Sequence, residues 1–247
     1  VVLKTFAALG VFGTSAITAI TAQNTLGVTR ADALDPSLVA AQIEAVAVDL
    51  HPQAAKTGML ANAAIIEAVV ESVRRFGIRP LEVDPVMVAS SGDVLLEPDA
   101  ITAVRQRLLP VADLVTPNLA EASTLTGAPV GNEAEMRAAA AALVAMGARA
   151  ALVKGGHLTG EEMVDVLYDG HDYHVVRAPR LPANNPHGTG CTLSAAIAAG
   201  LALGQDLPTA VTEGVHFVRR AIAAAPGLGQ GRGPLHHFHA FSTNAPD

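Results

Sequence analysis

The sequence predicts an α/β fold built on a mainly parallel central sheet, and three observations lead to this prediction. Short apolar runs alternate with helical patterns along the chain. Of the 247 residues, 50% are hydrophobic and 16% are charged, which suffices for one substantial core. No linker, charge block or internal repeat precedes the Gly-rich tail at 227–233. Repeated strand–helix units imply right-handed crossovers between parallel strands, so residues 1–247 are expected to form a single domain.

Caps and apolar runs set the expected elements in order. Asp35 and Pro36 are typical of an N-cap and a first helical position, and Asn62 and Gly77 are typical of the start and end of the next helix. The expected helices are 35–48, 62–76, 98–109, 118–125, 133–146, 190–203 and 207–224. The expected strands are a buried strand at 16–20, then 54–57, 81–83, 114–116 and 150–154, followed by an antiparallel hairpin of 163–168 and 173–176 with a primed turn at Asp169-Gly170.

Composition disfavours several classes of partner. The net charge is −7 and the chain has no Lys/Arg cluster, so nucleic acid is not expected as a partner. The apolar run at 193–204 is too short to span a membrane. The run at 6–22 resembles a signal-peptide core but is interrupted by glycine and threonine, so no membrane partner is expected. One cysteine excludes an internal disulfide, which suits a cytoplasmic protein.

Polar residues follow the expected strands. Ligands of parallel sheets bind beyond the carboxyl ends of the strands, so these residues are expected to lie near one site. They are Gln23, Asn24, Lys56, Thr57, Asp84, Thr116, Asn118 and Lys154.

The segment from Gly188 to Thr192 precedes a long Ala-rich helix and is a candidate anion site. Its two glycines allow a tight turn and a close backbone approach. The N–H groups of a helix N-terminus favour phosphate, although the same residues suit a plain strand-to-helix turn. No Walker A loop or G-x-G-x-x-G motif is present, so bound ATP would need this cradle.

Three side chains near this cradle each have two interpretations. Cys191 is either a small buried residue or a thiol whose pKa is lowered by the helix N-terminus. Lys154 is either solvated or in contact with phosphate oxygens. Gln23 either caps a strand end or pairs its amide with the edge of a heterocycle such as an aminopyrimidine.

Two carboxylates suggest a metal. Asp84 and Glu121 are each plausible caps, yet carboxylates beside bound phosphates would hold Mg²⁺, usually through water. Together they would complete a phosphoryl-transfer site, where catalysis is mostly positioning and charge stabilisation. A zinc site at His236, His237 and His239 is disfavoured because no further ligand at a defined spacing accompanies them.

The motifs, taken together, resemble one family. The chain is similar to the bacterial hydroxymethylpyrimidine/phosphomethylpyrimidine kinases of thiamin biosynthesis, in the ribokinase superfamily. The resemblance runs from Leu3 to Phe238. The segments that carry it are 4–10 (KTFAALG), 18–25 (TAITAQNT), 56–60 (KTGML), 84–87 (DPVM), 116–121 (TPNLAE), 153–157 (VKGGH), 187–192 (HGTGCT) and 233–238 (GPLHHF).

This resemblance implies a three-layer α/β/α ribokinase-like sandwich. It also implies phosphorylation of 4-amino-5-hydroxymethyl-2-methylpyrimidine and then of its monophosphate, with ATP and Mg²⁺, by a homodimer. The implied roles are pyrimidine binding for Gln23, Met59 and Val86, metal binding for Asp84 and Glu121, ATP binding for Lys154, Thr189 and Asn118, and the anion hole for Gly188, Gly190 and Cys191.

One feature departs from the family pattern. The family begins with a strand and a Gly-rich substrate loop, whereas Val1 and Val2 directly precede Leu3 here. We expect these elements to be omitted from the given sequence. Two other functions are considered: a vitamin B6 kinase acting on pyridoxal, which the pyrimidine preference of Gln23 would argue against, and a non-catalytic binder of nucleotide or pyrimidine.

Overall fold

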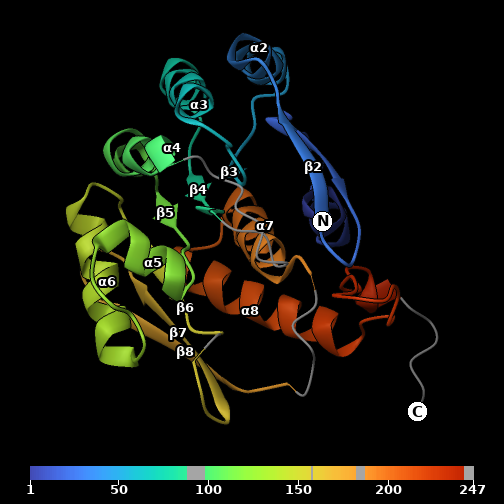
Figure 1. Ribbon diagram of the computed structural model, residues 1–247, viewed down its shortest axis with the longest axis vertical. Coiled ribbons are helices and arrows are strands. Elements are labelled where there is room, and N and C mark those ends of the chain that lie inside the picture. The colour runs from blue at the N-terminus through green and yellow to red at the C-terminus, as the bar shows by residue number, and fades with distance from the viewer. Residues whose placement is uncertain (88–97, 157, 182–186, 242–247) are drawn as a thin grey trace.

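Six strands form the central sheet in the order β3-β4-β5-β6-β7-β8 (Figure 1). The computed structural model describes residues 1–87, 98–156, 158–181 and 187–241. Strands β3 (Ala55–Thr57), β4 (Leu81–Val83), β5 (Leu114–Val115) and β6 (Ala151–Lys154) are parallel. Strands β7 (Glu162–Tyr168) and β8 (Tyr173–Pro179) continue the sheet in antiparallel fashion. The prediction of a mainly parallel sheet is therefore confirmed.

Helices cover both faces of this sheet. One face packs against α3 (Ala63–Phe76), α4 (Pro98–Ala103) with the π-helix Val104–Leu108 and the 3-10 helix Leu109–Val111 that continue it, α5 (Leu119–Thr126) and α6 (Glu133–Ala145). The other face packs against α7 (Thr189–Ala202) and α8 (Leu207–Ala223). Alternate strand residues face opposite layers: Val115 belongs to the first core and Leu114 to the second. The expected three layers are present.

The predicted helix caps are also present. The Asp35 carboxylate accepts a hydrogen bond from the N–H of Ser37 at the start of α2 (Pro36–Ala47). Asn62 accepts from the N–H of Ile65, and Gly77 ends α3 at a φ of 60°. Local chemistry alone fixes these boundaries, because a cap side chain satisfies backbone groups within one turn.

The expected buried strand at 16–20 is wrong. The strand there is β1 (Ala19–Gln23), which pairs with β2 (Val28–Ala33) as a separate antiparallel ribbon. Most residues of the ribbon are exposed, and it stands apart from the main sheet (Figure 1). An apolar run predicts a strand but not the surface that covers it. The turn is local, since the Asn24 side chain accepts from the N–H groups of Leu26 and Gly27.

The hairpin of β7 and β8 is confirmed, but its turn is longer than predicted. Four residues, 169–172, separate the strands. The Asp169 carboxylate accepts hydrogen bonds from the N–H groups of His171 at 2.9 Å and Asp172 at 2.8 Å. This Asx-type bonding stabilises a four-residue loop in place of the two-residue primed turn.

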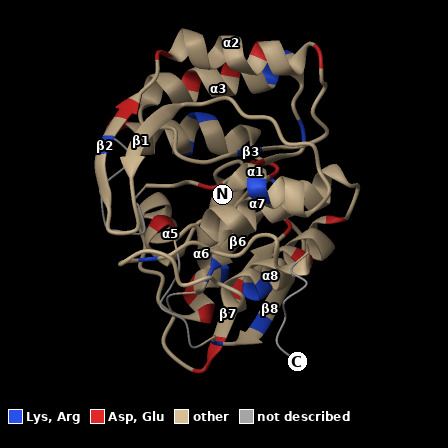
Figure 2. Cartoon of the chain, turned by 90° about the vertical axis from the view of Figure 1, so that its right-hand side faces the viewer, with Lys and Arg blue, Asp and Glu red and all other residues tan. Residues whose placement is uncertain are grey.

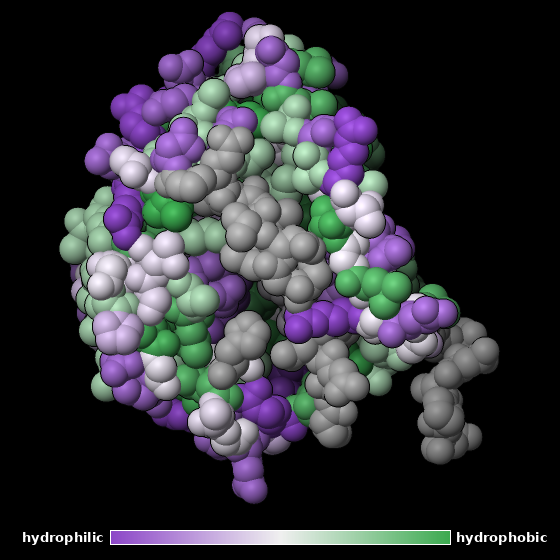
Figure 3. Space-filling view, in the orientation of Figure 1, coloured by the Kyte–Doolittle hydropathy of each residue, from purple (hydrophilic) through white to green (hydrophobic). Residues whose placement is uncertain are grey.

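The N-terminal helix was not predicted. Helix α1 (Val2–Ala8) lies against α7, and Figure 2 shows the two side by side near the end of β3. Over the face seen in Figure 3, areas of hydrophobic residues are broken up by polar ones. Within the described residues, no helix combines the length and the apolar character needed to cross a membrane. His157, part of one quoted motif, lies outside the described residues.

Candidate active site

A buried ion pair lies at the carboxyl edge of the parallel strands. Asp84 follows β4 directly, and Lys154 is the last residue of β6. The Lys154 Nζ lies 2.9 Å from the Asp84 Oδ1, and the two side chains are only 12% and 3% exposed. The predicted meeting of strand ends thus brings these two residues together from 70 positions apart in the sequence.

Electrostatics keeps both partners charged. Burial acts to raise the pKa of Asp84, but the positive charges of Lys154 and Lys56 hold it below its ordinary value. Burial acts to lower the pKa of Lys154, yet the carboxylates of Asp84 and Glu121 raise it above its ordinary value. A charged, hydrogen-bonded pair is the form in which buried charges are tolerated.

The N-terminus of α7 borders this ion pair. Gly188 is the N-cap with a φ of 88°, a left-handed conformation that favours glycine. At Gly190, an added Cβ would lie 3.3 Å from the Lys154 Nζ, so the ammonium group lies against this first turn. The Thr192 hydroxyl donates to the Gly188 carbonyl at 2.8 Å and lies 3.1 Å from the His237 Nε2. The glycine-rich turn therefore places helix N–H groups beside a buried cation.

Cys191 joins the same cluster. Its half-buried thiol is hydrogen-bonded to the Asp84 carboxylate. Burial and the charge of Asp84 raise the pKa of Cys191, although Lys56 and Lys154 oppose the rise. Of the two interpretations of Cys191, the buried residue fits better than the thiol with a lowered pKa, because desolvation and the adjacent carboxylate raise the pKa.

Asn118 and Glu121 form a capping box at the start of α5. The Asn118 side chain accepts from the Glu121 N–H at 3.0 Å, and a Glu121 carboxylate oxygen accepts from the Asn118 N–H at 2.8 Å. The backbone of Asn118 also forms an isolated parallel β-bridge with Lys154. Burial and the charge of Asp84 raise the pKa of Glu121, while Lys154 opposes this. The cap interpretation is thus confirmed, and Glu121 is still close enough to feel the charge of Asp84.

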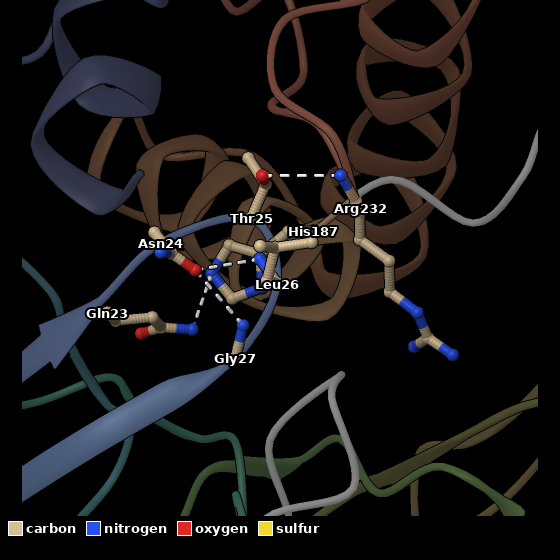
Figure 4. A pocket seen from close by; sticks show the side chains of 8 residues that line it. Gln23, Asn24, Thr25, Leu26, Gly27, His187 and Arg232 are labelled. Carbon is tan, nitrogen blue, oxygen red and sulfur yellow. Dashed lines mark hydrogen bonds between the residues drawn. The ribbon is translucent and has the colours of Figure 1, made fainter.

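Gln23 lies in a separate pocket of about 190 Å³ (Figure 4). The pocket lies between the turn of the β1–β2 ribbon, His187 and the segment 231–232. The Gln23 Nε2 lies 3.4 Å from the His187 Nε2, and the Arg232 N–H donates to the Thr25 carbonyl at 2.9 Å. His187 immediately precedes Gly188, so this pocket adjoins the start of α7.

Met59 and Val86 do not line that pocket. Met59 is half-buried against the core, and its carbonyl accepts from the Thr18 hydroxyl at 2.6 Å. Val86 is half-buried two residues after Asp84. Thr189, the first residue of α7, adjoins Gly188 and Gly190.

Two buried carboxyls were missed in the sequence. Glu82 on β4 is fully buried, and its carboxylate accepts a hydrogen bond from the Thr116 hydroxyl at 2.7 Å. Burial is the main cause that raises the pKa of Glu82 to about 8. Asp165 on β7 accepts from the Gly155 N–H at 2.8 Å, and burial raises its pKa to about 6. An isolated acidic residue inside a short apolar strand is the only sequence signal for either.

Comparisons with known proteins agree with this arrangement. Residues 3–236 match the family described as "Phosphomethylpyrimidine kinase". The hydroxymethylpyrimidine/phosphomethylpyrimidine kinase of Rhizobium meliloti (strain 1021) is 54% identical over 240 residues, covering 96% of this chain and 90% of that protein.

Solved structures share the fold. A phosphomethylpyrimidine kinase from Clostridium difficile 630 is 39% identical with a TM-score of 0.80, covering 90% of this chain and 91% of that one. The pyridoxal kinase of Bacillus subtilis, solved as an ADP complex, is 33% identical with a TM-score of 0.88, covering 97% of this chain and 91% of that one. The expected ribokinase-like fold is thereby confirmed.

Proposed function

Because the chain belongs to the phosphomethylpyrimidine kinase family, we propose that it transfers phosphate from ATP to 4-amino-5-hydroxymethyl-2-methylpyrimidine and then to the monophosphate. The product is the diphosphate used in thiamin biosynthesis. The observation that carries the proposal is the buried Asp84–Lys154 pair against the first turn of α7. A fixed cation beside helix N–H groups is suited to stabilising a phosphoryl group in transfer.

The bond changes are those of a kinase. The hydroxymethyl oxygen forms a bond to the γ-phosphorus of ATP, the bond from that phosphorus to the bridging oxygen breaks, and ADP and the hydroxyl proton are released. In the second transfer, a phosphate oxygen of the monophosphate is the attacking atom. The protein contributes position and charge, since little covalent chemistry is left for it to perform.

The acceptor side is assigned to Gln23, Met59 and Val86. The Gln23 amide has both a donor and an acceptor, which match the ring nitrogen and the amino group of an aminopyrimidine. Its place beside His187, next to the start of α7, supports this role. Met59 and Val86 are half-buried apolar side chains that follow β3 and β4, where a heterocycle could pack.

The nucleotide side is assigned to Lys154, Thr189 and Asn118, with Gly188 and Gly190 as the anion hole. Asp84 and Glu121 fit Mg²⁺, because the two carboxylates lie close enough for the charge of Asp84 to raise the pKa of Glu121. A divalent cation would relieve that repulsion, and Mg²⁺ held there would neutralise charge on the phosphates. Within the described ranges, no group of three or more His, Cys, Asp or Glu could hold a metal. Mg²⁺ held by one or two carboxylates usually keeps several water ligands.

Cys191 is assigned a positioning role. Burial and the charge of Asp84 raise the pKa of Cys191, which favours a thiol that donates to Asp84 over the thiolate of a direct base. It can hold the acceptor hydroxyl against the anion hole while Asp84 keeps its charge.

Residues 1–247 are proposed to act as one domain and the protein to form a homodimer. Large apolar side chains on the β1–β2 ribbon support an interface there, since Ile20 is 61% and Leu26 64% exposed. The cytoplasmic location stays a prediction.

The test is release of ADP by the purified protein with Mg²⁺-ATP and three acceptors in turn: hydroxymethylpyrimidine, its monophosphate and pyridoxal. The proposal expects turnover of both pyrimidines and weak use of pyridoxal. Preference for pyridoxal would move the assignment to a vitamin B6 kinase, the activity named for the Bacillus subtilis neighbour. Nucleotide binding without turnover of any acceptor would support the non-catalytic binder instead.

A further inference from the structure

Lys56 is a cation of the site with no role in the assignments above. It lies on β3, in register with Glu82 on β4. Register partners on parallel strands point to the same face of a sheet, and here that face packs against α7. An added Cβ on Gly58 would lie 3.5 Å from the Lys56 Nζ, so the side chain runs toward the carboxyl edge of β3.

Lys56 forms no close ion pair within the described part of the chain, although its charge lowers the pKa of its register partner Glu82 against the effect of burial. No carboxylate there lies within 4.0 Å of its ammonium group, whereas Lys154 is paired with Asp84. Its register neighbour Glu82 directs one oxygen to the Thr116 hydroxyl. Lys56 is nevertheless near the reacting groups, since its charge acts on both Asp84 and Cys191.

The position of Lys56 in the sheet places it on the acceptor side. β3 is the edge strand, next to β4, while β6, which ends in Lys154, is fourth in the order. Figure 1 shows β3 on the side of the molecule nearer the β1–β2 ribbon, which carries Gln23. Three residues after Lys56 comes Met59, which the proposed function places against the pyrimidine.

The two acceptors of the proposed reaction differ in charge. The first is a neutral alcohol, and the second is a phosphate monoester with a charge of about −1.5 to −2 at neutral pH. A site that already contains the carboxylates of Asp84 and Glu121 and the phosphates of ATP repels such an acceptor unless a cation meets it. The Lys154 ammonium group is paired with Asp84 and lies against the first turn of α7, so a different cation is needed for the acceptor phosphate.

We propose that Lys56 binds the phosphate of a phosphorylated acceptor, so that binding of the monophosphate depends on Lys56 and binding of the neutral alcohol does not. This inference rests on the proposed function. It assigns the two cations to different phosphates: Lys154 to the donor and Lys56 to the acceptor. An ammonium–phosphate contact is a charge-assisted hydrogen bond. Removing it should weaken the binding of the charged acceptor and not that of the neutral alcohol.

The experiment measures kcat and KM separately for hydroxymethylpyrimidine and for its purified monophosphate, in the parent protein and in Lys56→Met. The KM for the monophosphate is expected to rise about 10- to 100-fold, the usual effect of losing a hydrogen bond to a charged group. The KM values for the alcohol and for ATP are expected to stay within about three-fold. Lys56→Arg should restore most of the affinity, because a cation remains.

Lys4→Met, on the exposed surface of α1, removes an equal charge and serves as the matched control. Lys4→Met should change the KM of neither acceptor. An equal rise in KM for both acceptors in Lys56→Met, or no rise for the monophosphate, would overturn the inference. Activity of the parent protein on both pyrimidines would still uphold the proposed function. If the parent turns over neither pyrimidine, the proposed function fails and the inference falls with it. Titration of the monophosphate into each protein without nucleotide gives a second readout, with weaker binding expected in Lys56→Met.

Discussion

Asp165→Asn is expected to make the protein more stable than its parent by an amount that grows with pH. Asp165 is 3% exposed in the middle of β7 and accepts a hydrogen bond from the Gly155 N–H. The asparagine carbonyl can accept the same bond, so the substitution removes mainly a buried titrating group. Burial raises the pKa of Asp165 from 3.8 to about 6 in the folded protein.

The sign follows from linkage. The unfolded chain releases the Asp165 proton near pH 3.8, whereas the folded chain keeps it until about pH 6. Raising the pH through this window therefore favours the unfolded state of the parent and not that of the variant. At about 1.4 kcal/mol per pKa unit, the parent is penalised by about 1.5 kcal/mol at pH 5 and by about 3 kcal/mol at pH 8.

The assay is urea unfolding of both proteins at several pH values from 5 to 8. The variant's advantage in free energy of unfolding should rise by about 1.5 kcal/mol across this range, whatever constant offset the asparagine introduces. An advantage that is flat or falls with pH would refute the reasoning. Asp169→Asn is the control of opposite sign: the Asp172 N–H, the His174 ring and the His171 N–H lower the pKa of Asp169 to about 2, so this variant should be less stable than the parent at pH 8.

The remaining predictions concern the acceptor, the thiol and the backbone. Gln23→Met should raise the KM for both pyrimidines about 10-fold or more, because the ring edge loses its amide partner, and should leave the KM for ATP within a few-fold. Equal rises in the KM for ATP and for the pyrimidines in steady-state assays would contradict the role of Gln23. Cys191→Ala should slow turnover about 10²-fold with ATP binding nearly unchanged in titration calorimetry, and unchanged turnover would make Cys191 a packing residue. Gly155→Ala should lower the free energy of unfolding by about 2 kcal/mol or more, because the new Cβ would lie 1.9 Å from the Val164 carbonyl oxygen. Gly156→Ala is its matched control in denaturant melts and should unfold like the parent, because within the described residues no atom outside its chain neighbours lies within 4 Å of the added Cβ.

Features set by local chemistry were predictable from the sequence. Asp35 and Asn62 cap their helices through groups within one turn, so no knowledge of the rest of the chain was needed. The meeting of Asp84 and Lys154 was predictable because parallel strands end at one edge. Both predictions depend on regularities that hold in any α/β sheet.

Features set by tertiary surroundings were not predictable. The apolar run before Gln23 indicated a strand, but whether other elements cover that strand depends on packing. The direction of the Cys191 pKa shift depends on the approach of Asp84 from a different strand. Glu82 is a single acidic residue in a three-residue strand, and only the arrangement of its neighbours makes it a buried carboxyl.

The most direct test of the account is the identity of the product. The purified protein would be incubated with Mg²⁺-ATP and hydroxymethylpyrimidine, and the reaction followed by ³¹P NMR. The account predicts that a monophosphate ester signal appears first and is then replaced by the paired signals of a diphosphate ester, as ATP is converted to ADP. A reaction that stops at the monophosphate, or ATP that is hydrolysed to inorganic phosphate with no ester formed, would contradict it.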